Sequence, residues 1–451
     1  MKRIIIAVSL LLVIQSIASA DLFQYVAKED PSFKWEKVEQ QALPFDMQRY
    51  DIDLVSQTWK DIAWNHRLTL IKPKAIKNPT MVFLIITGSW NKNKDNSEEV
   101  MYGSAIASGI GAPVAILYDV PRQPLFNGLR EDGLISYTFT KVMETQDPEW
   151  ALLLPMAKSA VKAMDTIEQF MNQELNTTVS GFVVAGASKR GWTTWLSSAV
   201  DERVKGICPM VYDNLDLPAQ MKHQVDTWGT YSEQIDDYTK LDLPQQLQTE
   251  KGQKLAALVD PYTYRDRITI PKLIIVGSND RYWPLDAMNL YFNDLIGEKY
   301  ILRVPNKGHD VGDPTRIIND AVAFFQKVNG NLKFPKLSWN YNRNYNKGNE
   351  GLELIVMSDQ KPKSVSVWTA SSDTKDFRDA SWQETNMELR SAPGGKYIVD
   401  GTIVGYIENW NYFYALKKPQ KGYAAIFGEA VYPSGDKEYF LSTEVRIIGE
   451  K

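Results

Sequence analysis

The stretch "GFVVAGASKRGWTTWLSSAV", residues 181–200, begins as an apolar run, turns at a serine and continues with a helical pattern. The apolar run lacks polar alternation, which is typical of a parallel strand buried on both faces. A strand that passes at once into a helix places the turn residue at the sheet edge, beside the helix N-terminus. Ser188 occupies this turn. The stretch therefore predicts an α/β sheet with a candidate nucleophile at its edge.

The spelling of the turn differs from the usual G-x-S-x-G signature. Gly186 precedes Ser188 as the motif requires, whereas Arg190 stands at the second glycine position and Gly191 follows it. Other strand–turn–helix units hold G-x-S by chance, so the local motif also fits a strand that simply meets a helix. The interpretation depends on whether an acid and a base follow.

The surrounding chain predicts a parallel sheet with crossover helices. From residue 50 to about residue 330, short β-branched runs alternate with longer amphipathic stretches. The strongest helical patterns cover 152–175 and 313–328, the second with Asp313 as N-cap and Pro314 at its first position. We also expect two antiparallel strands within 51–73. The remaining predicted strands cover 81–87, 113–120, 181–186, 204–212, 272–278 and 300–305.

Two later strand ends supply an acid and a base. Asp280 follows the predicted strand 272–278, and His309 follows the predicted strand 300–305. Serine, aspartate and histidine in this chain order are the triad of an α/β-hydrolase. In such a triad Ser188 attacks, His309 acts as base and then as acid, and Asp280 orients the imidazole. In the competing interpretation Asp280 caps a helix and His309 is a loop residue; Asp310 is a weaker candidate for the acid.

A developing oxyanion needs preorganised N–H donors near the nucleophile. The backbone N–H of Lys189, at the helix start, is one candidate. The loop "ITGSWNK" after an early predicted strand offers Gly88, Ser89 and Trp90 as the source of the second donor.

Charged side chains near the same edge are candidates for substrate binding. Glu131 and Asp132 form a carboxylate pair that would receive a substrate amine in a peptidase, or else belong to a solvated loop or helix cap. Arg190, with Lys189, would meet a negatively charged group, or else is solvated at the helix start.

Two segments depart from the alternating pattern. Residues 213–266 are polar, aromatic and helical in composition, which predicts a cap over the sheet edge, or an insertion with only a packing role. Short alternating runs after residue 330 predict a small β-sandwich of immunoglobulin or fibronectin type over residues 331–451, following an α/β-hydrolase domain over 21–330. We expect its aromatic side chains to lie in the core rather than in an exposed binding strip: Trp368, Trp382, Trp410, Tyr412 and Tyr414.

Composition narrows the classes of partner and cofactor. The formal net charge is −4, and lysines and arginines are scattered, so no nucleic-acid surface is predicted. His66, His223, His309 and the single cysteine cannot form a recognisable zinc site, and no metal or other cofactor is predicted. Cys208 lies between apolar residues and is expected to be a buried, inert thiol.

The N-terminus predicts export. Lys2 and Arg3 precede an apolar run from residue 4 to residue 14, and residues 18–20 form a small-residue cleavage site. The run is shorter than the roughly 20 residues that span a bilayer, so we expect cleavage rather than a lasting membrane anchor. A periplasmic or secreted protein follows from this prediction.

Several blocks together identify a family resemblance. "VPRQPLF" (120–126), "GASKRGWTTW" (186–195) and "VPNKGHD" (304–310), with "REDGLISYTF", "PEWALLLPMAKSAVKAMD", "YDNLDLPAQMKHQ" and "DPYTYRDRITIPKLIIVGSNDRYW", resemble the PhoPQ-activated pathogenicity-related proteins of bacteria and amoebae. The resemblance implies an α/β-hydrolase-like domain, a following β-rich domain and a triad on Ser188, Asp280 and His309.

The resemblance also bears on activity. Bacterial members are associated with virulence and with resistance to cationic antimicrobial peptides, and an amoebal member is similar in fold to prolyl dipeptidyl peptidases, which implies peptide hydrolysis. The turn is also similar to the G-x-S-R-x-G of glucuronoyl esterases, although Lys189 stands in place of the arginine. We therefore expect an exported serine hydrolase acting on a peptide or small ester. The alternatives are a carbohydrate or acyl esterase, and a non-enzymatic signalling or peptide-sequestering protein.

Overall fold

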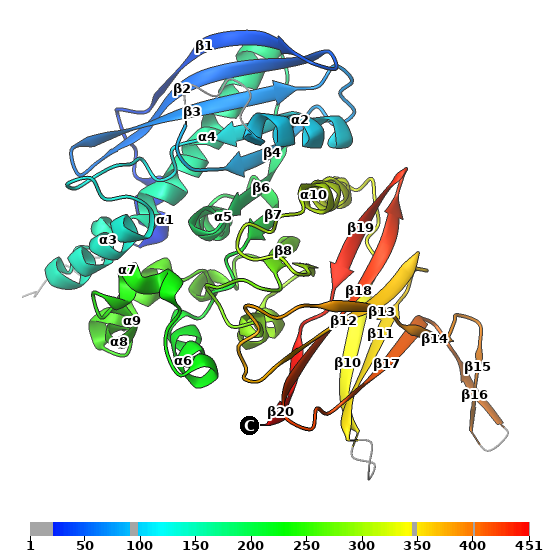
Figure 1. Ribbon diagram of the computed structural model, residues 1–451. Helices are drawn as coiled ribbons and strands as arrows, with labels where there is room; N and C mark the ends of the chain where they lie inside the picture. Colours follow the sequence, from blue (N-terminus) through cyan, green and yellow to red (C-terminus); the bar gives the residue numbers. More distant parts are fainter. Residues whose placement is uncertain (1–20, 91–97, 345–349, 400–401, 451) are drawn as a thin grey trace, which may run out of the picture.

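The computed structural model describes residues 21–90, 98–344, 350–399 and 402–450 (Figure 1). The predicted signal peptide, residues 1–20, lies outside these residues. Within them, no helix is long and apolar enough to cross a membrane.

The central element is a nine-stranded sheet in the order β1-β2-β3-β5-β4-β6-β7-β8-β9. The first three strands are antiparallel, β3 pairs antiparallel with β5, and all later pairs are parallel. This mixed order, with helices on both faces, confirms the predicted α/β-hydrolase fold. The strands are β1 (Lys34–Leu43), β2 (Met47–Trp59), β3 (Ile62–Lys72), β4 (Met81–Ile86), β5 (Val114–Leu117), β6 (Gly181–Ala187), β7 (Val204–Met210), β8 (Lys272–Gly277) and β9 (Lys299–Val304).

Helices cover the two faces of the sheet and create two apolar cores. One face packs against α1 (Leu22–Ala27), α4 (Leu153–Leu175) and α5 (Lys189–Val200). The other face packs against α2 (Glu98–Ile110) and α10 (Pro314–Val328). The Asp313 side chain accepts a hydrogen bond from Arg316 N–H at 3.1 Å, which confirms the predicted start of α10.

Between β7 and β8 the chain forms a group of short helices, which we call the cap (residues 213–266). It contains α6 (Leu217–Trp228), α7 (Asp236–Thr239), α8 (Leu243–Gln246) and α9 (Glu250–Val259), with 3-10 turns at Glu233–Ile235 and Pro261–Tyr264. Helix α3 (Glu131–Thr145) packs against α7, α8 and α9 (Figure 1). Three further 3-10 turns lie outside the cap, at Pro148–Trp150, Ala287–Leu290 and Phe292–Asp294.

The C-terminal part is an antiparallel β domain made of two main sheets. The first has the order β10-β11-β17-β14, the second the order β13-β12-β18-β19 with β20 paired to β18, and a separate hairpin joins β15 to β16. The strands are β10 (Leu337–Asn344), β11 (Gly351–Ser358), β12 (Ser364–Ser372), β13 (Gln383–Asn386), β14 (Glu388–Ser391), β15 (Lys396–Val399), β16 (Thr402–Tyr406), β17 (Trp410–Lys417), β18 (Gly422–Ser434), β19 (Lys437–Ser442) and β20 (Arg446–Glu450).

The five aromatic side chains predicted for the core of this domain lie in or against apolar clusters, as expected. Trp382 and Tyr412 are buried, while Trp368, Trp410 and Tyr414 are partly buried and pack against the same clusters. One of these clusters is continuous with the core under α2 and α10, since it joins residues of β9 and α10 to residues of β11 and β19. The two parts of the chain therefore share apolar core, and Figure 1 shows β19 beside α10.

Candidate active site

Ser188 lies on a sharp turn between β6 and α5. Its backbone has φ of 58° and ψ of −125°, and its N–H donates to the carbonyl oxygen of Met210 on β7 at 2.8 Å. A positive φ at a residue other than glycine is uncommon and strained, and such strain is concentrated at functional sites. The turn leaves the Ser188 side chain partly exposed at the carboxyl edge of the sheet.

Two glycines make this turn possible. A Cβ at Gly186 would lie 2.5 Å from the carbonyl oxygen of Arg190, and a Cβ at Gly191 would lie 2.9 Å from that of Met210. Both clashes are with backbone atoms, which have little room to move. The second glycine is therefore required at 191 rather than at 190, which explains the unusual spelling of the motif.

Asp280 and His309 form a hydrogen-bonded pair at the ends of β8 and β9. His309 Nδ1 lies 2.8 Å from Asp280 Oδ2, and Asp280 Oδ1 accepts the N–H of Tyr282 at 2.8 Å. The Tyr282 ring stacks on the imidazole with a centroid separation of 4.1 Å. His309 Nε2 is buried and has no hydrogen-bond partner among the described residues. This arrangement places the proton on Nδ1 and leaves the Nε2 lone pair free to accept one.

The turns that carry Asp280 and His309 are packed directly against each other. A Cβ at Gly277 would lie 2.3 Å from the carbonyl oxygens of Lys307 and Gly308, so only glycine permits this approach. Asn279 N–H donates to the same Lys307 carbonyl at 2.9 Å. Close backbone contact therefore brings Asp280 and His309 together.

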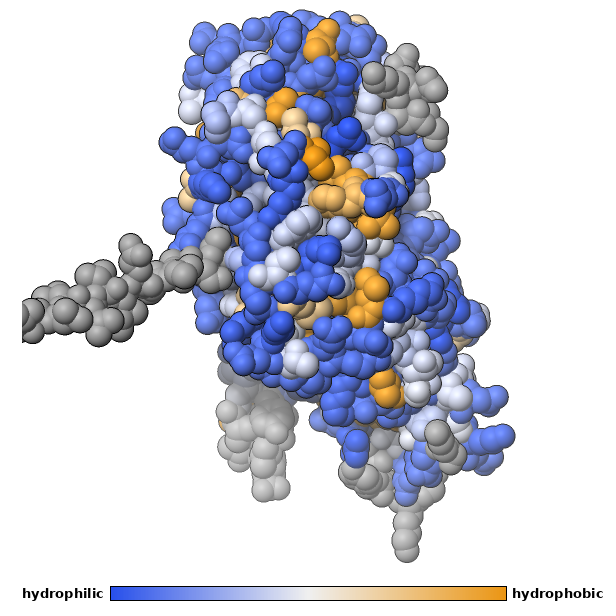
Figure 2. Space-filling model, turned by 90° about the vertical axis from the view of Figure 1, so that its left-hand side faces the viewer, coloured by the Kyte–Doolittle hydropathy of each residue, from blue (hydrophilic) through white to orange (hydrophobic). Residues whose placement is uncertain are grey.

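A cavity of about 80 Å³ lies between Ser188 and the cap. Ser188 and Tyr282 both line it, and the Tyr282 ring is the one that stacks on His309. No hydrogen bond joins Ser188 to His309 Nε2 among the described residues. The lining is mostly apolar and comes from α3, α5 and the cap, including Phe139, Trp192, Leu217, Met221, Tyr238 and Leu255. The outer face that carries α3 and the cap helices is mainly hydrophilic, with small separate hydrophobic patches (Figure 2). The cap thus turns its apolar side chains inward over the serine.

The predicted oxyanion donors fall into two groups. Lys189 N–H is at the first position of α5, where a helix has no internal acceptor for it. No hydrogen bond is found for the Ser89 N–H within the described part of the chain, and the Ser89 hydroxyl accepts from Gln123 Nε2 at 3.2 Å. The Trp90 N–H donates instead to Asp119 Oδ1 at 3.1 Å. This bond corrects the expectation for Trp90, because its donor is already used.

The charged residues beside Ser188 bind one another. Arg190 makes a bidentate pair with Glu131 through Nη1 and Nη2, each at 2.8 Å, and Lys189 Nζ lies 2.9 Å from Glu131 Oε2. Burial alone would raise the pKa of Glu131, but hydrogen bonding and the charges of Arg190 and Lys189 lower it well below its usual range. Glu131 and Arg190 are therefore bound to each other, and their contact with a substrate stays a prediction.

Asp132 is the carboxylate that lines the cavity. It lies 3.4 Å from Lys189 Nζ and accepts hydrogen bonds from the hydroxyls of Tyr238 at 3.0 Å and Tyr282 at 3.5 Å. Sequence reasoning did not single out either tyrosine. Tyr282 follows Asp280 by two residues, and this proximity was the one signal available for it.

The other histidines and the cysteine lie away from this site. His66 is buried between Ser56 Oγ and the Tyr118 carbonyl, each at 3.0 Å, and burial lowers its pKa to about 4. His223 on α6 pairs with Asp286 at 2.7 Å. Cys208 is buried in β7, and burial raises the pKa of its thiol. Among the described residues, no group of three or more potential ligands is arranged to hold a metal ion.

Comparisons with known proteins find one family and several distant structures. The family described as PhoPQ-activated pathogenicity-related protein matches residues 22–378. Autocrine proliferation repressor protein A of Dictyostelium discoideum is 32% identical over 477 residues, which cover 97% of this chain and 92% of that protein.

Two of the similar solved structures are esterases. The acetyl xylan esterase of Paenibacillus sp. R4 has a TM-score of 0.49 and 17% identity, covering 69% of this chain and 92% of its own. Acetyl xylan esterase 1 of Thermoanaerobacterium sp. JW/SL YS485 has a TM-score of 0.47 and 17% identity, covering 68% of this chain and 92% of its own.

Proposed function

The chain belongs to the PhoPQ-activated pathogenicity-related protein family, and from that premise we propose that it is a serine hydrolase with Ser188 as its nucleophile. His309 is the general base, and Asp280 orients its imidazole. The observation that carries the proposal is the 2.8 Å pair between His309 Nδ1 and Asp280 Oδ2 with Nε2 unpaired, together with the Tyr282 ring, which stacks on His309 and lines the same cavity as Ser188.

The proposed reaction has two halves. His309 Nε2 takes the hydroxyl proton as Ser188 Oγ attacks the carbonyl carbon, and the Lys189 and Ser89 N–H groups stabilise the resulting oxyanion. The tetrahedral intermediate collapses when His309 returns the proton to the departing alcohol or amine, which leaves an acyl-enzyme on Ser188. Water, deprotonated by His309, then attacks the acyl-enzyme, and the acid product leaves as Ser188 recovers its proton.

The cavity suits a short, uncharged acyl group. Its volume of about 80 Å³ compares with the roughly 10–15 Å³ that one water molecule needs on the same measure, so it admits only a few heavy atoms. Its charged members, Lys189 and Asp132, face each other and do not present a net charge to the acyl group. The carboxylate pair expected to receive the amine of a peptide is engaged with Lys189 and Arg190. These features support a small apolar ester more than a peptide with a free N-terminus.

The proposal is tested by turnover of two substrate series by the purified protein. The first consists of nitrophenyl esters of increasing acyl length, and the second of aminoacyl-prolyl anilides. We expect the highest kcat/KM for short acyl esters and a loss of at least about 1,000-fold in Ser188→Ala. Ser180→Ala is the matched control, because Ser180 precedes the same strand at its opposite end.

Two outcomes would count against the proposal. Turnover that survives in Ser188→Ala would place the nucleophile elsewhere. A folded wild-type protein that turns over neither series between pH 6 and pH 9 would favour the non-enzymatic, peptide-sequestering alternative. A preference for the anilides would restore the peptide as substrate.

The sequence of residues 1–20 leads us to propose that the enzyme acts in the periplasm or outside the cell.

A further inference from the structure

We propose that a loop of the C-terminal β domain positions the catalytic acid and base. This loop, residues 373–382 between β12 and β13, contacts both turns that carry Asp280 and His309. Asn279 and Asn306 are the positioning residues through which it acts. The inference rests on the proposed function for its catalytic consequence, while the contacts themselves do not depend on it.

Asn279, the neighbour of Asp280, is held by the backbone of this loop. Its side-chain amide donates to the carbonyl oxygens of Phe377 at 3.4 Å, Arg378 at 3.2 Å and Ala380 at 2.7 Å. Its Oδ1 accepts from Ser278 Oγ at 2.6 Å. Both ends of the amide are therefore engaged, which fixes the orientation of the turn that ends in Asp280.

Asn306 holds the turn that leads to His309 in a matching way. Its side chain donates to the Trp382 carbonyl at 3.0 Å and accepts the Trp382 N–H at 2.7 Å. Its own N–H donates to Ser278 Oγ at 2.8 Å, which links it to the acid turn. The Trp382 ring is buried against Phe427, with a centroid separation of 5.0 Å, so the loop is anchored in the core of the β domain.

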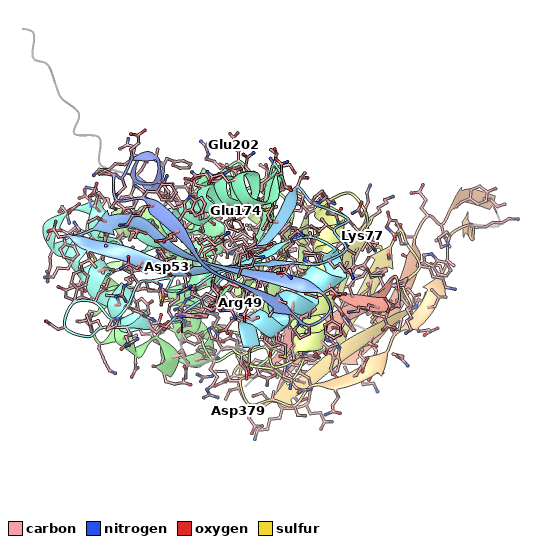
Figure 3. All side chains as sticks on the ribbon, turned by 90° about the horizontal axis from the view of Figure 1, so that it is seen from above. Arg49, Asp53, Lys77, Glu174, Glu202 and Asp379 are labelled. Atoms are coloured by element: carbon pink, nitrogen blue, oxygen red, sulfur yellow. The ribbon has the colours of Figure 1, made fainter. Side chains whose placement is uncertain are left out.

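The outer edge of the loop makes a different kind of contact. Arg378 of the loop forms an ion pair with Glu233 of the cap at 2.7 Å. Arg281 forms two ion pairs, one with the same Glu233 at 2.7 Å and one with Asp379 of the loop at 2.9 Å. The Asp379 side chain is 91% exposed, and Figure 3 shows it at the edge of the molecule. The pairs made by Arg281 are exposed and contribute little, whereas the Arg378 side chain is only 14% exposed. The two asparagines lie within the turns themselves and are held by backbone groups of the loop, so they carry the positioning.

Small movements of these turns have large catalytic consequences. Catalytic groups must be held within about 0.5 Å of their working geometry, and a misplacement of about 1 Å costs on the order of 100-fold in rate. The proton transfer from Ser188 to His309 Nε2 depends on both turns at once. The cavity is lined mainly by α3, α5 and the cap, with Tyr282 and Trp283 coming from the segment after Asp280, so loosening the turns should affect substrate binding less than proton transfer.

The test compares Asn279→Ala with Asn289→Ala. Asn289 is a matched control because its side-chain amide also donates to a backbone carbonyl of the β domain, that of Val445 at 2.9 Å, but away from the triad turns. In Asn279→Ala we expect kcat to fall by about 10- to 100-fold with KM changed by less than about twofold. In Asn289→Ala we expect a similar loss of thermal stability and an unchanged kcat. Asn306→Ser provides a second variant, with the same expected loss of kcat.

A proton NMR signal gives a readout that needs no turnover. The Nδ1 proton of His309, shared with Asp280, is expected to resonate far downfield in the wild type and in Asn289→Ala. We expect the signal to broaden or vanish in Asn279→Ala and in Asn306→Ser. If the wild type has no hydrolase activity but the signal behaves in this way, the proposed function fails and the positioning role stands. If both asparagine variants at the triad turns keep the signal and kcat, or if Asn289→Ala loses as much kcat, the positioning role is overturned.

Discussion

Arg190 occupies the position at which the nucleophile motif usually has glycine, and its side chain joins three parts of the site. It pairs with Glu131 at the start of α3, and its guanidinium packs against Gly88, where a Cβ would lie 3.0 Å from Nη2. The basic pair beside Ser188 is therefore part of the framework of the site.

At the scale of single residues, removing the charge of Glu131 should destabilise the protein. In Glu131→Gln, Arg190 loses its anionic partner and Lys189 keeps only Asp132 at 3.4 Å, while both cations remain mostly buried. We expect the free energy of unfolding at pH 7 to fall by about 2 kcal/mol. This is less than the cost of breaking a fully buried ion pair, because the Glu131 side chain is 41% exposed. Urea unfolding measures this loss. Glu144→Gln is the control, because it removes an exposed ion pair with Lys141 and should leave the free energy of unfolding almost unchanged.

The effect of Glu131→Gln on the free energy of unfolding should depend on pH. Because the pKa of Glu131 is lowered on folding, its contribution is present above its unfolded pKa of about 4.3 and is lost as the pH falls below that value. The difference between wild type and Glu131→Gln should therefore shrink under acidic conditions. A difference that stays constant down to pH 3 would contradict this account.

The displaced glycine of the motif gives a second prediction. In Gly191→Ala the added methyl group meets the backbone of β7 and β6, so we expect a loss of about 1–3 kcal/mol in stability. Gly133→Ala is the control, since a Cβ in that helix would make only an ordinary 3.5 Å contact with Asp237. Equal thermal shifts for the two variants would refute the explanation of the motif.

The sequence predicted some residues of the site better than others. Ser188, Asp280 and His309 can be proposed from the sequence because each follows a recognisable buried strand. The ion pair between Glu131 and Arg190 joins residues 59 positions apart in the chain, and no local pattern predicts such a pair. The hydrogen bond of the Trp90 N–H likewise has its acceptor, Asp119, 29 residues away.

At the scale of elements, Asp260 fastens both ends of the cap. Its carboxylate accepts the N–H groups of Leu217 at 2.7 Å and Asp216 at 3.3 Å at the start of α6, and that of Tyr262 at 2.9 Å after α9. Burial raises its pKa to about 7, although the backbone hydrogen bonds oppose the shift. The cap is thus attached through a carboxylic acid whose ionisation is unfavourable in the folded protein.

Because this pKa is raised on folding, the contribution of Asp260 to stability should decrease as the pH rises. The contribution of Asp260 is fully present below its unfolded pKa of about 3.9 and is lost as the pH rises through about 7. We expect the decrease in unfolding free energy between pH 5 and pH 8 to be smaller in Asp260→Asn than in wild type. Urea titrations at the two pH values measure it, and an equal decrease in both proteins would contradict the prediction.

Most elements were predictable because they have strong patterns. The buried strands β4 to β9 and the long helices α4 and α10 appear at the predicted positions. The sequence did not reveal β1, since its residues, KWEKVEQQAL, are mostly polar and exposed and form an edge strand without an apolar run. The short helices of the cap were likewise visible only as a composition.

At the scale of the whole molecule, the β domain completes the core of the N-terminal α/β domain. Phe440 N–H donates to the buried Asp320 of α10 at 2.9 Å, and Arg303 N–H of β9 donates to Ser442 Oγ at 3.0 Å. Arg316 of α10 pairs with the buried Glu429 of β18. These pairs join residues more than 100 positions apart in sequence, which is why the sequence predicted a β domain but not how it docks.

Separating the two parts should therefore abolish folding. A chain that ends at residue 330 would expose the apolar residues of β9 and α10 that the β domain covers. We expect this fragment to be insoluble or unfolded by circular dichroism, and the full chain to unfold in one calorimetric transition. A soluble, folded fragment, or two separate transitions in the full chain, would contradict the shared core.

The measurement that tests the central claim most directly is the intact mass of the protein after reaction with a fluorophosphonate. We predict one adduct in the wild type, located on Ser188 by peptide mapping, and none in Ser188→Ala under the same conditions. His309→Ala should react far more slowly, because its Ser188 lacks a base. A folded wild-type protein that stays unlabelled, or a Ser188→Ala variant that is still labelled, would contradict the assignment of Ser188 as the nucleophile.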